Sequence, residues 1–85
     1  MRYKVEFTAS ALREFRALDR QIQRRISAKI SELTENPLPA GANKFHGEAD
    51  HWRIRVGDYR IIYRVEKHRV VIVVVRIGHR REVYR

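Results

Sequence analysis

The sequence predicts an α+β fold, a two-layer sandwich in which an N-terminal strand and a helical hairpin pack on an antiparallel sheet. Two patterns support this prediction. Apolar residues recur at helical spacing between residues 11 and 33, whereas apolar and polar residues alternate between residues 52 and 65. Helices gathered early in the chain and strands gathered late are typical of this architecture, here in the order β-α-α-β-β-β. With 85 residues, the chain is expected to form one domain, residues 1–85.

The first element is a short strand, because apolar residues alternate with charged ones over residues 3–7. Thr8 or Ser10 can then cap a helix, since a hydroxyl oxygen accepts a hydrogen bond from a free backbone N–H of the first helical turn. The apolar positions that we expect this helix to bury are Ala11, Leu12, Phe15 and Leu18.

A second helix is expected to begin after Asp19, another residue suited to capping. It should end at Asn36-Pro37, because the residue before a proline avoids helical geometry. Its inward stripe is predicted to be Ile22, Ile26, Ile30 and Leu33. Because the connection between the two helices is so short, we expect them to form an antiparallel hairpin.

The second half of the chain predicts a meander of strands. Gly57-Asp58 is a hairpin signal between two alternating segments, residues 52–56 and 59–65. The continuous apolar run from Val70 to Val75 is typical of a central strand covered on both faces. The segment from Gly78 to Arg85 is expected to be a turn followed by a short extended piece.

The predicted hairpin gathers arginines on one face of the sheet. A loop centred on Gly57-Asp58 places Arg55 opposite Arg60, with Arg53 on the same face and Arg64 further along. Like charges directly opposite each other are unfavourable in a sheet. Guanidinium groups match the geometry of phosphate, so this face is suited to an anion. The alternative is a solvated basic face with no specific ligand.

The charge balance points to the same class of ligand. The chain carries 19 Lys and Arg against 10 Asp and Glu, a formal net charge of +9, and such a field attracts nucleic acid, an anionic membrane surface or an acidic protein. It has no cysteine, which excludes disulfides, thiolate zinc sites and cysteine nucleophiles and fits a cytoplasmic protein. The four histidines lack metal-ligand spacing, so we expect no metal and no cofactor. No apolar run is long enough to span a membrane.

The end of the chain adds three residues with suitable chemistry. Histidine at position 79 can exchange protons near neutral pH, Arg80 can stabilise charge on a phosphate, and Tyr84 can stack on a base. By itself, a His-Arg pair before a short strand is more often part of an ordinary surface than of a site.

Several segments resemble the RelE/ParE toxin superfamily. They are Tyr3-Lys4-Val5-Glu6-Phe7, Asn43-Lys44-Phe45-His46-Gly47, the stretch from Trp52 to Tyr63 that contains Arg-Val-Gly-Asp-Tyr-Arg, and Gly78-His79-Arg80 before Val83-Tyr84. The resemblance covers nearly the whole chain in order. It does not separate the branches of the superfamily.

The RelE branch implies a toxin of a type II toxin–antitoxin system, a ribonuclease that cuts mRNA in the A site of the 30S ribosomal subunit. By position, the resemblance implies catalytic roles for Arg60, Arg80 and Tyr84 and RNA binding by Arg53, Arg55 and Lys44. The best-known RelE members carry lysines where Arg53 and Arg55 stand, and arginine is a poor general base because it stays protonated. A base must then come from elsewhere in the chain or from the ribosome, or be dispensed with, and His79 is the candidate for proton transfer within the chain.

Two other functions remain open at this stage. A ParE-like toxin would inhibit DNA gyrase by binding the protein, without cutting RNA. A basic module could also bind nucleic acid without any catalysis, with a steep dependence on salt.

A protein partner is also expected. The resemblance implies a cognate acidic antitoxin in a hetero-oligomer, and such a protein would neutralise the positive charge. The helices can cover only one face of a strand over residues 70–75, so we expect the antitoxin to cover the other face, which would otherwise favour aggregation.

Overall fold

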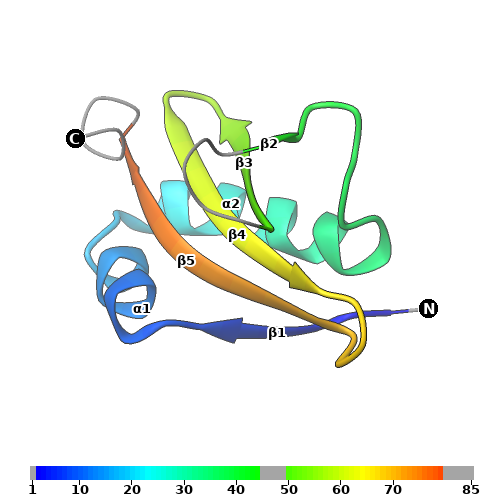
Figure 1. Ribbon diagram of the computed structural model, residues 1–85. Coiled ribbons are helices and arrows are strands. Elements are labelled where there is room, and N and C mark those ends of the chain that lie inside the picture. Colours follow the sequence, from blue (N-terminus) through cyan, green and yellow to red (C-terminus); the bar gives the residue numbers. More distant parts are fainter. Residues whose placement is uncertain (1, 45–49, 80–85) are drawn as a thin grey trace.

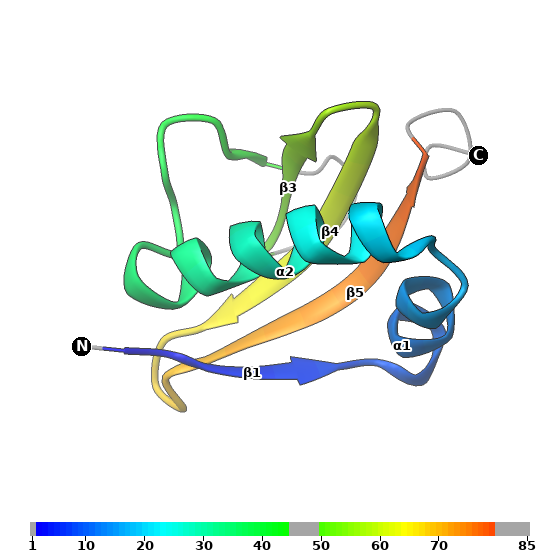
Figure 2. The ribbon, with the colours of Figure 1, turned by 180° about the vertical axis from the view of Figure 1, so that it is seen from behind.

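The computed structural model describes residues 2–44 and 50–79. Its elements are β1 (Lys4–Phe7), α1 (Ala9–Arg16), α2 (Arg20–Glu35), β2 (Asn43–Lys44), β3 (His51–Val56), β4 (Tyr59–Glu66) and β5 (Val71–His79). The strands form one sheet in the order β1-β5-β4-β3-β2, and α2 lies across one face of it (Figures 1 and 2). The α+β fold is therefore confirmed. No helix in the described part of the chain is long and apolar enough to cross a membrane.

The sheet is mixed rather than wholly antiparallel. Strands β3, β4 and β5 follow one another as antiparallel neighbours, as expected. The N-terminal strand β1 instead joins the sheet at its edge, parallel to β5, with Lys4 opposite Val71 and Phe7 opposite Val74. Parallel neighbours need a long connection, and the chain between β1 and β5, which includes both helices, supplies it. The two-residue strand β2 on the opposite edge was not predicted.

Both helices begin where the sequence predicts, but α1 ends at Arg16, so that Leu18, which was expected within it, lies beyond its end. Thr8 caps α1, its Oγ1 accepting a hydrogen bond of 3.1 Å from the backbone N–H of Ala11. Asp19 caps α2 in the same way, accepting from the N–H of Ile22 at 3.0 Å. The second helix ends at Glu35, before the Asn36-Pro37 pair.

The prediction of an antiparallel helical hairpin is wrong. In Figures 1 and 2, α1 is seen nearly along its axis while α2 runs across the view, so the helices cross steeply. The orientation of α1 follows from its contacts with β5. Beyond Val74 the edge of β5 is no longer paired with β1, and residues at the start of α1 and within it bond to this edge instead. The backbone N–H of Thr8 donates to Val74 O at 3.0 Å, and its hydroxyl donates to Val75 O at 3.1 Å. Glu14 Oε1 accepts from the N–H of Ile77 at 2.9 Å.

The core lies between the helices and the sheet. Its buried members are Ala11, Ile26, Ile30, Leu33, Ile54, Val56, Ile61, Tyr63, Ile72, Val74 and Ile77. Tyr63 is fully buried, and its hydroxyl donates to Pro37 O at 2.7 Å. This burial raises the pKa of Tyr63 to about 12. Leu12, which the sequence placed in the core, is exposed instead.

The last strand differs from its prediction at both ends. Val70 has a positive φ of 55° and belongs to the turn, and the strand runs on through Gly78 and His79, which we expected in a turn. Val71 and Val73, on the face away from the helices, are only 4% and 5% exposed within this chain. The expectation that this face needs a partner for cover is therefore wrong at these two residues.

Candidate nucleic-acid interface

The pairing of β3 with β4 is the one predicted from the sequence. Arg55 lies opposite Arg60, Ile54 opposite Ile61 and Val56 opposite Tyr59. Because Ile54, Val56 and Ile61 are core residues, the alternating side chains of Arg53, Arg55 and Arg60 leave the sheet on the other side. We call this surface, defined by Arg53, Arg55 and Arg60, the arginine face.

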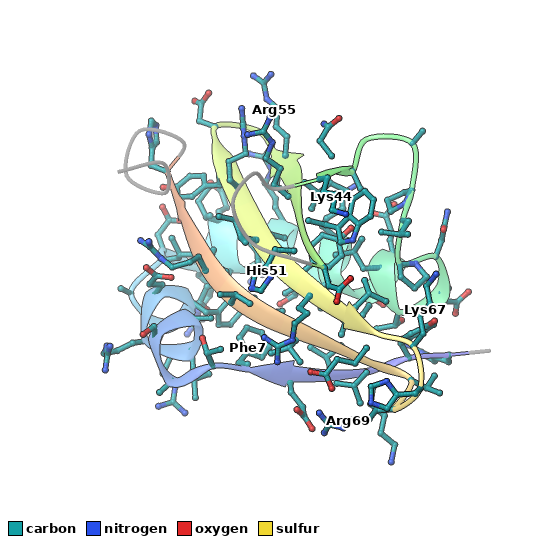
Figure 3. All side chains as sticks on the ribbon, in the orientation of Figure 1. Phe7, Lys44, His51, Arg55, Lys67 and Arg69 are labelled. Atoms are coloured by element: carbon teal, nitrogen blue, oxygen red, sulfur yellow. The ribbon has the colours of Figure 1, made fainter. Side chains whose placement is uncertain are left out.

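The arginine face is centred near the turn between β3 and β4. Directly opposite residues in an antiparallel pair have Cα atoms about 4.5–5.5 Å apart, so Arg55 and Arg60 are immediate neighbours. Arg55 is exposed, and its Nε donates to the backbone oxygen of Gly57 at 2.9 Å. Arg53 and Arg60 are half-buried. In Figure 3, Arg55 projects beyond the end of the hairpin. Neighbouring guanidinium forks of this kind can hold a phosphate oxygen from several sides.

Arg64 shares this side of the sheet but is neutralised by a glutamate, Glu66. Its Nη2 lies 2.8 Å from Glu66 Oε2, and Glu66 also pairs with Arg69, which in turn reaches Glu6 at 3.1 Å. The hydrogen bonds from Arg64 and Arg69 lower the pKa of Glu66. This network lies at the end of the sheet marked by Arg69 in Figure 3, away from Arg55. Arg64 is therefore part of a structural ion-pair network rather than of the arginine face.

His79 and Lys44 lie away from the arginine face. His79 is opposite Tyr59, which packs against the core, and the two rings meet edge to face with centroids 5.7 Å apart. Its side chain therefore starts on the helix side, where it lines a partly open cavity of about 380 Å³ together with Glu14 of α1 and the two residues that follow this helix, Ala17 and Leu18. Lys44 is opposite Trp52, so the register directs it to the helix side as well. Arg80 and Tyr84 fall outside the described residues.

The family follows from a comparison with known sequences. A family model described as the ParE toxin of the type II toxin–antitoxin system parDE matches residues 5–84. The chain belongs to the RelE/ParE toxin superfamily.

Individual relatives of the toxin carry RelE names. A putative RelE-like toxin protein of Escherichia coli is 35% identical over 82 residues, covering 94% of this chain and 85% of that protein. The mRNA interferase toxin RelE of Escherichia coli strain K12 is 34% identical over 88 residues, covering 99% and 92%. The toxin also superimposes on a chain of the intact E. coli RelBE toxin–antitoxin complex with a TM-score of 0.81 and 32% identity, covering 91% and 95% of the two chains.

Sequence reasoning missed two residues on the arginine-bearing side of the toxin. His51 lies opposite Arg64 and precedes Arg53 by two positions, so the same alternation that identified the arginines could have identified it. Figure 3 shows it in front of the sheet. Arg76 lies opposite Ile62 and is bound to Glu14 of α1, with Nε 3.1 Å from Oε2. No local sequence pattern predicts the ion pair between Arg76 and Glu14, because 62 positions separate the two residues.

Proposed function

We propose that the toxin is a ribosome-dependent endoribonuclease that cuts mRNA in the A site and so inhibits translation. The observation that supports this proposal is the arginine face, where Arg55 and Arg60 are direct neighbours and Arg53 follows on the same strand. A sheet selected for stability alone would place a neutral or acidic residue opposite Arg55. The name of the E. coli relative, an mRNA interferase toxin, supports the same activity.

In this proposal the arginines have two different roles, binding the RNA backbone and stabilising charge at the phosphate that is cut. Arg53 and Arg55 hold the backbone through their guanidinium forks, while Arg60 and Arg80 stabilise the charge on the pentavalent phosphate. Tyr84 stacks on a base and orients it. Lys44 adds a contact at the edge of the sheet, where it is exposed. Cleavage then depends mainly on positioning and charge stabilisation, which supply much of the rate in other enzymes.

Proton transfer is the part of the reaction that arginines cannot perform. Attack of a 2′-hydroxyl on the adjacent phosphorus requires loss of the hydroxyl proton and protonation of the departing 5′-oxygen. We assign this transfer to His79, whose side chain starts on the helix side but which follows Gly78, the residue opposite Arg60. His51 is the rival, because the register places it on the side of the sheet that carries Arg53. Replacing each histidine by Gln and comparing the pH dependence of cleavage decides between them, since only the acting histidine should change the profile.

We further propose that a cognate acidic antitoxin holds the toxin inactive in the cytoplasm, in a hetero-oligomer. The excess positive charge of the toxin and its similarity to a chain of the RelBE complex support this partner. Co-expression with the antitoxin should relieve growth inhibition. If no acidic antitoxin protein relieves the growth arrest on co-expression, this assignment fails.

Expression of the toxin alone, followed by primer extension on a reporter mRNA, tests the activity. The wild-type toxin should produce breaks within translated codons, and Arg60→Ala should abolish both the breaks and growth inhibition. Arg24→Ala, which removes one exposed charge from α2, is the matched control and should remain toxic. The matching family model is named for ParE, so supercoiling by purified gyrase should be measured in parallel. Gyrase inhibition without mRNA breaks would refute the nuclease and support the ParE-like function.

A further inference from the structure

A third element contributes an arginine to the turn between β3 and β4. Gly57 has a positive φ of 59°, and the guanidinium of Arg25, from α2, lies against it. A Cβ at position 57 would lie 2.7 Å from Arg25 Nη2 and 3.3 Å from its Cζ. A side chain at position 57 would force the end of Arg25 to shift, whereas glycine leaves room for the guanidinium beside the backbone of the turn.

Arg25 thereby lies next to the arginine face, on the helix side of the same turn. The backbone oxygen of Gly57 accepts a hydrogen bond from Arg55, so two guanidinium groups contact the same glycine. Arg55 in turn lies opposite Arg60. Guanidinium groups from α2, β3 and β4 therefore surround one two-residue turn, and the cationic surface continues from the sheet face to the helix side.

Arg25 is one of several arginines in the described part of the chain that form no ion pair with a carboxylate. Arg64, Arg69 and Arg76 each pair with a glutamate, whereas within residues 2–44 and 50–79 Arg25 has no ion pair with a carboxylate. Asp58, in the turn, makes no ion pair with it either. Cations held together at one turn repel one another, and an external anion would remove this cost.

We propose that Arg25 contacts an RNA backbone phosphate, so that the RNA-binding surface extends from the arginine face around the Gly57-Asp58 turn to α2. The proposal rests on the nuclease function above and adds a residue that its sequence motif does not contain. Arginine suits the role because its planar fork binds phosphate oxygens in pairs. Gly57 leaves room for that fork beside the backbone of the turn.

Salt dependence of binding distinguishes a phosphate contact from a purely structural role. Each phosphate contact releases a counterion, which contributes about 0.7 to the slope of log K against log salt for a single strand and about 0.9 for a duplex. The probe is a programmed ribosome whose A-site codon carries 2′-O-methyl groups, so that the mRNA stays intact. The dissociation constant of each toxin variant is measured over a range of KCl concentrations.

The variants are Arg25→Gln and its neighbour Arg24→Gln, each of which removes one charge from α2. Helical spacing places Arg24 away from the sheet, two residues before the buried Ile26, and Arg25 on the flank beside the turn. Arg25→Gln should weaken binding about tenfold and reduce the slope by about 0.7. Arg24→Gln should change neither. If Arg25→Gln and the wild type have equal slopes, the proposal is overturned. This holds even if Arg25→Gln binds more weakly, provided that the loss of affinity is the same at every salt concentration.

The phosphate could belong to the mRNA or to ribosomal RNA. Neutral methylphosphonates next to the A-site codon separate the two sources. If they abolish the difference between the wild type and Arg25→Gln, Arg25 contacts the mRNA, and if the difference persists, it contacts ribosomal RNA. Failure of the wild-type toxin to bind programmed ribosomes would instead refute the proposed function, so the two failures are distinguishable.

Discussion

Repulsion between Arg55 and Arg60 should lower the free energy of unfolding of the toxin, and this prediction can be tested without any RNA. Their side chains leave the same face of the sheet from directly opposite positions. Two unit charges in water repel by about 0.4–0.8 kcal/mol at separations of about 5–10 Å, and measured cross-strand pairs contribute about 0.2–1 kcal/mol. Arg55→Thr should therefore raise the free energy of unfolding by about 0.5 kcal/mol, since threonine also favours a strand.

Urea unfolding of four proteins isolates the interaction. They are the wild type, Arg55→Thr, Arg60→Thr and the double variant, and their cycle cancels whatever contacts each arginine makes elsewhere. The coupling energy should be repulsive and should shrink as salt is added. Arg64→Thr, on the same side of the sheet, is the contrast and should destabilise because it breaks the ion pair with Glu66. A coupling energy of zero, or an attractive one, would refute the reasoning.

The same substitutions should impair function while improving stability. If the arginine face binds RNA, Arg55→Thr should cleave mRNA on ribosomes more slowly than the wild type although it is better folded. If the arginines form a solvated basic surface with no ligand, Arg55→Thr should raise stability without slowing cleavage.

Three further predictions follow from the core and the sheet edge. Because the raised pKa of Tyr63 favours its neutral form in the folded state, stability should fall from pH 10 to pH 12 by up to about 1.4 kcal/mol per pH unit. Tyr63→Phe should lack this component and cost about 1 kcal/mol at neutral pH, where Pro37 O loses its donor. In urea titrations, Glu14→Ala should cost about 1–3 kcal/mol by leaving the Ile77 N–H unsatisfied, whereas Glu35→Ala, which is exposed, should cost little. The lowered pKa of Glu66 means that the folded state favours the charged carboxylate. The stabilisation that Glu66 contributes should therefore be present above pH 4.5 and be lost as the pH falls through the lowered pKa. Glu66→Gln should remove this loss when the free energy of unfolding is measured over that acidic range.

Local patterns in the sequence were sufficient to predict both helix starts, strands β1, β3 and β4, and the arginine face, but not the short strand β2 or the ends of β5. Thr8 and Asp19 mark the helix starts because capping is a short-range interaction, and Gly57 fixes the hairpin register because β structure repeats every two residues. Once the register is known, the positions of Arg55 and Arg60 follow.

Interactions between residues distant in the sequence could not be predicted in this way. The parallel pairing of β1 with β5, the ion pair of Arg69 with Glu6 and the bonds of Glu14 to β5 all join residues more than 60 positions apart. The position of His79 on the helix side depends on how far β5 extends, which the expected turn at Gly78 concealed. The approach of Arg25 to Gly57 depends on where α2 crosses the sheet.

Single-turnover cleavage of mRNA on programmed ribosomes tests the central role of the arginine face most directly. The account predicts that Arg60→Ala lowers the cleavage rate by about 100-fold or more, the usual effect of removing a group that stabilises transition-state charge. Its free energy of unfolding should stay within about 1 kcal/mol of the wild type. Cleavage by Arg60→Ala at the wild-type rate would contradict the account.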